Sequence, residues 1–171
     1  MDDIEQALAG ARDILAEQFS EDKTARERIR GLYFAHGVFQ TKLVKDKESE
    51  AQKYENYFDW TEPVASAPSH RILAMRRGEN EGCLTLRISV PEEEAVGILR
   101  TQFVLNNSRC ARQVQLALED GFKRLLSSSM ETEVRLETKK RADTEAIRIF
   151  AENLQQLLMA SPLGQKRLLA V

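Results

Sequence analysis

The sequence predicts a mainly α protein, a multi-helix bundle with a long C-terminal helix and one or two short β-strands. Apolar residues recur every three or four positions along most of the chain, and the stretch 129–160 keeps this spacing without Pro or Gly. One segment alternates cleanly enough to be a strand. The 171 residues, 42% of them hydrophobic, suffice for one domain with a core.

Two helices are expected before residue 37. A helix from about 3 to 18 would place on one stripe the residues Ile4, Leu8, Ala11, Leu15 and Phe19. Ser20 is a candidate cap for a second helix over about 21–36, and Gly37 is suited to end it.

The next segment, 38–44, is too short and irregular to decide between a strand and an extended connection. Aromatic residues then return at helical spacing and predict a helix near 49–58. Pro63 and Pro68 interrupt this pattern because each lacks a backbone donor, so a loop should continue through Ala67.

A short helix over 69–78 is predicted by Ser69 as its cap and Gly78 as its end. The segment 83–90 is the best strand in the chain. Its alternation places on one face the residues Leu84, Leu86, Ile88 and Val90.

Pro91 and the three glutamates after it are typical of a helix start, since negative charge favours the positive end of the helix dipole. This helix should reach about Leu105. A further helix, capped by Ser108, should run to about Leu126 despite Gly121.

The stretch 129–160 would form a rod of about 45 Å at 1.5 Å per residue. Charges dominate residues 131–145, so we expect that half to be exposed or sparsely packed and the following half to be well buried. The sequence Ser161-Pro162-Leu163-Gly164 should end the helix.

The last six residues, 166–171, have the apolar character of a buried strand. We therefore expect a helical domain over 1–165 and, over 166–171, the truncated first strand of a following domain.

Charge alone does not attract this chain to polyanions, because 25 basic residues face 27 acidic ones. Nucleic acid would need a local patch. Two basic sets are candidates, although acidic neighbours such as Glu137 and Asp143 make pairing within a solvated helix the simpler interpretation of the first. The first set is Arg135, Lys139, Lys140, Arg141 and Arg148, and the second is Arg71, Arg76 and Arg77.

No catalytic residue, metal ligand or cofactor site is predicted. His36 and His70 lack neighbouring ligands in the sequence, and Ser69 beside His70 lacks the glycine-framed turn of a nucleophile. Aromatic residues near Tyr54 could stack on bases, but their spacing favours the core.

Cys83 and Cys110 are too few for a disulfide framework, the N-terminus is acidic, and no apolar run reaches 18 residues. We expect a cytoplasmic protein with no membrane partner.

Several blocks, in this order, resemble the Tex family of bacterial transcription accessory proteins, specifically part of its N-terminal helical region. They cover most of the chain from residue 7 onward. Among them are Pro68-Ser69-His70-Arg71, Glu131-Thr132-Glu133-Val134-Arg135 and Phe150-Ala151-Glu152-Asn153-Leu154. The resemblance implies that 166–171 begins a YqgF-type RNase H-like domain, followed further on by helix-hairpin-helix elements and an OB-fold RNA-binding domain.

The expected function is therefore a non-catalytic scaffold fragment of a protein that binds RNA or single-stranded DNA mainly through domains outside this chain. Two alternatives stay open. One is part of an RNase H-like metal-dependent nuclease. The other is an interaction module that docks RNA polymerase or ribosome-associated machinery through the long helix.

Overall fold

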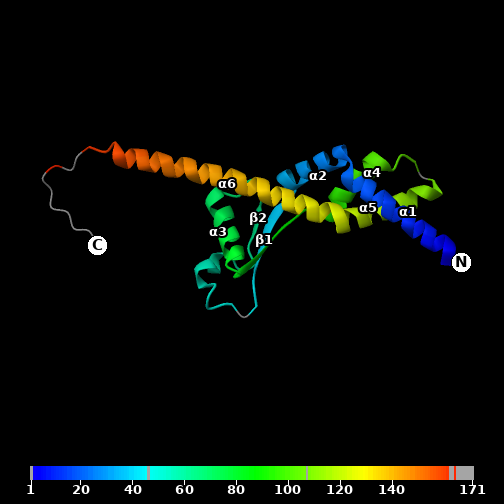
Figure 1. Cartoon of the computed structure of the whole chain (residues 1–171), viewed down its shortest axis with the longest axis horizontal. Helices are drawn as coiled ribbons and strands as arrows, with labels where there is room; N and C mark the ends of the chain where they lie inside the picture. Colours follow the sequence, from blue (N-terminus) through cyan, green and yellow to red (C-terminus); the bar gives the residue numbers. More distant parts are fainter. Residues whose placement is uncertain (1, 46, 107, 162–163, 165–171) are drawn as a thin grey trace.

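The computed structural model describes residues 2–45, 47–106, 108–161 and 164. The fold class is confirmed: the chain is mainly helical, with a long final helix and a small antiparallel sheet (Figure 1). The elements are α1 (Asp2–Glu21), α2 (Lys23–His36), β1 (Val38–Leu43), the 3-10 helix η1 (Gln52–Tyr57), β2 (Thr61–Pro63), α3 (Ser69–Asn80), β3 (Leu84–Ser89), α4 (Glu92–Phe103), α5 (Arg109–Gly121), the π-helical turn η2 (Phe122–Leu126) and α6 (Ser127–Leu158).

One helical rod forms the long axis of the molecule. α5, η2 and α6 follow one another without a break, so the π-helical turn is a local widening inside a single helix. α1 packs along α5 near one end of the rod, and α6 extends to the other end (Figure 1). At the α1 contact, a Cβ on Gly121 would lie 3.1 Å from the Cα of Ala16. The glycine therefore lets the two backbones approach closely.

The second helix begins at a different cap from the expected one. Asp22 accepts a 2.7 Å hydrogen bond from the backbone N–H of Ala25, whereas the Ser20 hydroxyl donates to the carbonyl of Glu17 inside α1. α1 continues to Glu21, and a carboxylate is at least as good a cap as a hydroxyl. The Ser20 prediction is wrong for this reason.

The sheet has the strand order β2-β1-β3 and both pairings are antiparallel. In the central pair, Phe39 lies opposite Ile88 and Thr41 opposite Leu86. The predicted alternation of β3 is confirmed, since Leu84, Leu86 and Ile88 are buried between exposed neighbours. α3 and α6 both contact β3, so these helices cover the sheet.

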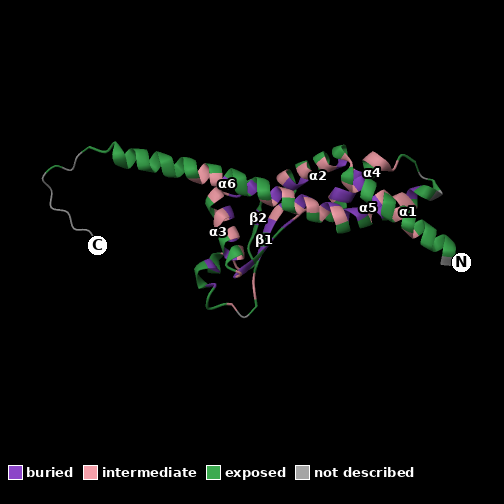
Figure 2. Cartoon of the chain, in the orientation of Figure 1, coloured by how far each residue is buried: buried purple, intermediate pink, exposed green. Residues whose placement is uncertain are grey.

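The pattern of burial along α6 is the opposite of the one that its composition suggested. The buried residues of α6 are Met130, Val134, Thr138 and Ala142, while residues 147–158, hereafter the distal segment, are exposed throughout (Figure 2). The expectation for 131–145 and the half after it is wrong. One buried residue in every four, with small side chains at Thr138 and Ala142, is enough for α3 and β3 to pack on α6. The charged residues lie on either side of this stripe.

Three smaller expectations also differ. The helix near 49–58 is a 3-10 helix, the loop after it contains the edge strand β2, and α3 is preceded by Pro68 as its cap residue, with Ser69 already helical. β2 tolerates Pro63 because it pairs on one side with β1 only. The strand expected over 166–171 lies outside the described residues.

Within the part of the chain that the structure describes, no helix combines the length and apolar character needed to cross a membrane.

Candidate nucleic-acid interface

The two basic sets predicted from the sequence come together where α3 packs against α6. Two adjoining hollows lie at this contact, and His70 and Leu73 line both of them. We call the first the α3–α6 groove, a space of about 1040 Å³, and the second the basic pocket, a space of about 660 Å³. Both volumes are in the range, or slightly above the range, of cavities that hold small ligands.

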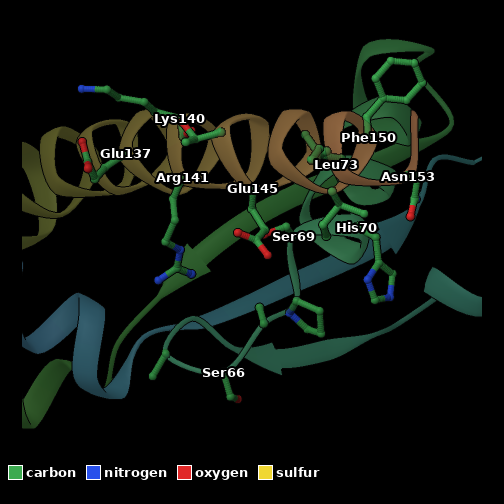
Figure 3. A pocket seen from close by; sticks show the side chains of 16 residues that line it. Ser66, Ser69, His70, Leu73, Glu137, Lys140, Arg141, Glu145, Phe150 and Asn153 are labelled. Atoms are coloured by element: carbon green, nitrogen blue, oxygen red, sulfur yellow. The ribbon is translucent and has the colours of Figure 1, made fainter. Parts of the chain in front are cut away.

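The α3–α6 groove has a mostly apolar lining that also contains charged residues of α6. Its walls are residues 65–68, the start of α3, and one side of α6 from Glu137 to Asn153. Arg141 and Glu145 reach from α6 toward the loop that carries Ser66, whereas Lys140 extends away from it (Figure 3). Arg141 also donates a 3.3 Å hydrogen bond to the carbonyl of Val64. Arg141 thus fastens α6 to the loop.

The basic pocket lies between η1, α3 and α6. Lys53 pairs with Glu81 at 2.5 Å across it, which raises the pKa of Lys53 and lowers the pKa of Glu81. The remaining lining residues of the pocket that are polar or aromatic are Tyr54, Tyr57, His70, Arg76, Arg77, Asn80 and Lys139.

Like Arg141, two further predicted basic residues join elements of the fold. Arg135 donates a 2.8 Å hydrogen bond to the carbonyl of Leu86 and is paired with Glu79. Arg71 pairs at 2.8 Å with the buried Glu62, and its guanidinium lies 5.6 Å from the ring centre of Trp60. These contacts tie α6 and α3 to the sheet.

Other members of the first set pair within α6. Arg148 lies 2.7 Å from Glu145 and is also paired with Glu152, and this pairing raises the pKa of Arg148 and lowers the pKa of Glu145. Lys139 is paired with Asp143. Such pairs along one helix face are the simpler interpretation that the sequence already offered.

Four predicted cations lack a carboxylate partner within 4 Å among the described residues: Lys140, Arg141, Arg76 and Arg77. Lys140 and Arg77 are exposed, and Arg76 is half-buried, where it donates a 3.3 Å hydrogen bond to the carbonyl of Arg135. Sequence reasoning missed Lys53 as their neighbour. In the sequence, the one feature that could have drawn attention to Lys53 is its position beside Tyr54. Lys53 becomes a neighbour of Arg76 and Arg77 only because η1 packs against α3 in the fold.

Across residues 2–45, 47–106 and 108–161, no three His, Cys, Asp or Glu side chains are grouped so as to hold a metal ion. His36 pairs at 2.7 Å with Glu94 of α4, whereas His70 belongs to α3. Ser69 and His70 both line the α3–α6 groove, yet the described residues contain no hydrogen bond between them. The side chains that line the two hollows offer chiefly charge and hydrogen bonding to a ligand.

Comparison with known proteins places the chain among longer proteins. A family described as Tex central region-like matches residues 1–150. The chain is 38% identical to YdcI of Bacillus subtilis over 169 residues, which covers 98% of the chain and 24% of YdcI. It is 37% identical to the transcriptional accessory protein Tex of Neisseria gonorrhoeae, covering 95% of the chain and 22% of that protein.

A human relative is more distant. The S1 RNA-binding domain-containing protein 1 of Homo sapiens is 28% identical over 175 residues, which covers 95% of the chain and 18% of that protein. The chain thus spans about a quarter or less of the relatives it matches.

Proposed function

Because this chain belongs to the Tex family, we propose that it is a non-catalytic helical scaffold within a cytoplasmic transcription accessory protein. Its task is to hold other domains of a longer protein in place while those domains bind RNA or single-stranded DNA. The names of two relatives, a transcriptional accessory protein and an S1 RNA-binding domain-containing protein, support a role linked to nucleic acid.

The observation that carries the scaffold proposal is the surface of the distal segment of α6. Phe150 is 68% exposed and Leu157 is 75% exposed, and their large apolar neighbours are exposed as well. The segment projects beyond the rest of the described fold (Figures 1 and 2). A continuous row of exposed apolar residues is unusual on a soluble monomer and marks a contact surface.

The proximal part of the same helix has the opposite character. Met130, Val134 and Thr138 are fully or almost fully buried against α2, α3 and β3. One rigid helix is thus anchored at one end and offers apolar side chains at the other. Such a rod can fix the position of whatever packs on its distal segment, since an α-helix is stiff over this length.

The test compares two lengths of the protein. The double variant Phe150→Ser/Leu157→Ser should leave the thermal stability of the 171-residue chain unchanged, because both residues are exposed there. In a longer chain that extends past Val171, it should lower the free energy of unfolding by about 1.5–3 kcal/mol for each buried side chain lost.

Leu136→Ser is the matched control, since Leu136 is 62% exposed but lies outside the distal segment. It should have no effect at either length. An equal effect of the double variant in both lengths, or no effect in the longer chain, would contradict the scaffold proposal.

A further inference from the structure

The basic pocket has more positive than negative charge on its walls. Lys53, Arg76, Arg77 and Lys139 line it together with a single acid, Glu81. Glu81 pairs with Lys53, and Lys139 is paired with Asp143 outside the lining. In the described part of the chain, the guanidinium groups of Arg76 and Arg77 form no ion pair within 4 Å. Arg77 is still near enough to Glu81 to help lower the pKa of that carboxyl.

A buried hydroxyl lies at the same place. Tyr54 is only 4% exposed, and its hydroxyl makes no hydrogen bond to any described residue. Burial raises the pKa of Tyr54, and the nearby Glu81 adds to this effect although the two groups do not meet hydrogen-bond geometry. The phenol is therefore neutral near pH 7 and keeps a proton to donate. A buried donor without an acceptor is rare and costs stability.

Other walls of the pocket suit a planar group. Tyr57 is half-buried and His70 is exposed, so each presents part of its ring to the cavity. Leu73 and Ala74 add apolar surface to the lining. A volume of about 660 Å³ is sufficient for a nucleotide-sized ligand.

We propose that the basic pocket binds a phosphate group carried by a nucleotide or a single-stranded polynucleotide. Arg77 and Arg76 supply the charge, and the Tyr54 hydroxyl donates a hydrogen bond to a phosphate oxygen. Guanidinium groups match phosphate geometry, and hydrogen bonds to a charged acceptor are about twice as strong as neutral ones. This inference is independent of the scaffold role, because it concerns η1 and α3 and leaves the distal segment of α6 aside.

The experiment measures binding to the 171-residue chain at low salt by calorimetry. The probes are inorganic phosphate, adenosine monophosphate and a short single-stranded RNA. We expect at least one of them to bind at millimolar concentration or below, with affinity that falls as salt rises.

Two variants test the assigned residues. Arg77→Ala should weaken binding at least tenfold, and Tyr54→Phe, which removes a single oxygen, should weaken it about tenfold. Arg28→Ala is the charge-matched control: Arg28 is exposed on α2, outside the pocket, and its loss should change affinity less than about twofold. Tyr54→Phe keeps the buried ring and removes a hydroxyl that makes no hydrogen bond in the described fold, so the melting temperature should change little.

The probes separate the two sources of phosphate. Binding of inorganic phosphate and the mononucleotide indicates a site for free ligands, and binding of RNA alone indicates a site for the backbone. Either result supports the proposal if Arg77→Ala and Tyr54→Phe both weaken the binding that is observed. The proposal is overturned if no probe binds, or if Arg77→Ala and Tyr54→Phe bind like Arg28→Ala. None of these outcomes affects the two-length comparison that tests the scaffold.

Discussion

Arg135 of α6 donates a 2.8 Å hydrogen bond to the backbone carbonyl of Leu86 in β3, while the same guanidinium pairs with Glu79 of α3. One side chain of α6 therefore joins α3 and β3, two consecutive elements that lie far earlier in the chain. Next to it, the Glu131 carboxylate accepts a 3.1 Å hydrogen bond from the backbone N–H of Ile88. These contacts explain how a sheet of three short strands is held against a long helix.

This geometry predicts a structural role for Arg135. Arg135→Lys should lower the free energy of unfolding by about 1–3 kcal/mol, because an ammonium group cannot serve the carbonyl and the carboxylate in the same planar arrangement. Chemical denaturation measures the effect. Arg148→Lys, on the exposed distal segment, is the control and should match the wild type. Equal stability of the two variants would refute the assignment.

The burial pattern in the proximal part of α6 predicts different losses of stability for two substitutions. Met130 is fully buried, so Met130→Ala should cost about 2–5 kcal/mol of unfolding free energy. Leu136→Ala, six residues further and mostly exposed, should stay within about 0.5 kcal/mol of the wild type. The reverse order would restore the interpretation based on charge content, in which this part of the helix is sparsely packed.

The contact between α1 and the helical rod predicts a difference between two glycines. No atom lies within 4 Å of a Cβ placed on Gly97 of α4, so Gly97→Ala should gain up to about 1 kcal/mol from helix propensity. A Cβ on Gly121 would press on the backbone of Ala16, and Gly121→Val should therefore destabilise the chain by about 1–3 kcal/mol. A stable Gly121→Val variant would show that α1 does not pack here.

Tyr33 predicts a loss of stability at alkaline pH. Burial raises the pKa of this phenol from 10.0 to about 12, and the nearby Glu131 adds to the shift. The folded state favours the protonated form, so the contribution of Tyr33 is complete below pH 10 and is lost as pH rises from 10 to about 12. The free energy of unfolding, measured with urea at several pH values across this window, should fall less steeply with pH for Tyr33→Phe than for the wild type. Parallel profiles for variant and wild type would contradict this cause.

Local patterns in the sequence account for most of the elements but for little of the packing. The alternation around Leu86 gives β3, and the regular apolar spacing gives the helices, because both signals depend on the chain's own periodicity. The edge strand β2 is three residues long and contains Pro63, so it has no periodicity to detect. The π-helical turn at 122–126 likewise leaves no local signal.

Burial along α6 and the composition of the basic pocket depend on contacts between distant segments. The apolar residues after Ile147 predicted a buried end, yet residues 147–158 are exposed in the described fold. Lys53 joins Arg77 and Lys139 only because η1 and α6 both pack around α3. Of the eight basic residues named from the sequence, Arg71, Arg135 and Arg141 make structural contacts. Charge content alone does not distinguish such residues from free surface cations.

Hydrogen exchange of the distal segment tests the scaffold account most directly. Backbone amides of residues 147–158 should exchange rapidly in the 171-residue chain and at least about tenfold more slowly in a chain that continues past Val171, while amides near Val134 should be protected alike in both. The account predicts this selective protection. Equal exchange of the distal segment at both lengths would contradict it, because no other part of the protein would then rest on that surface.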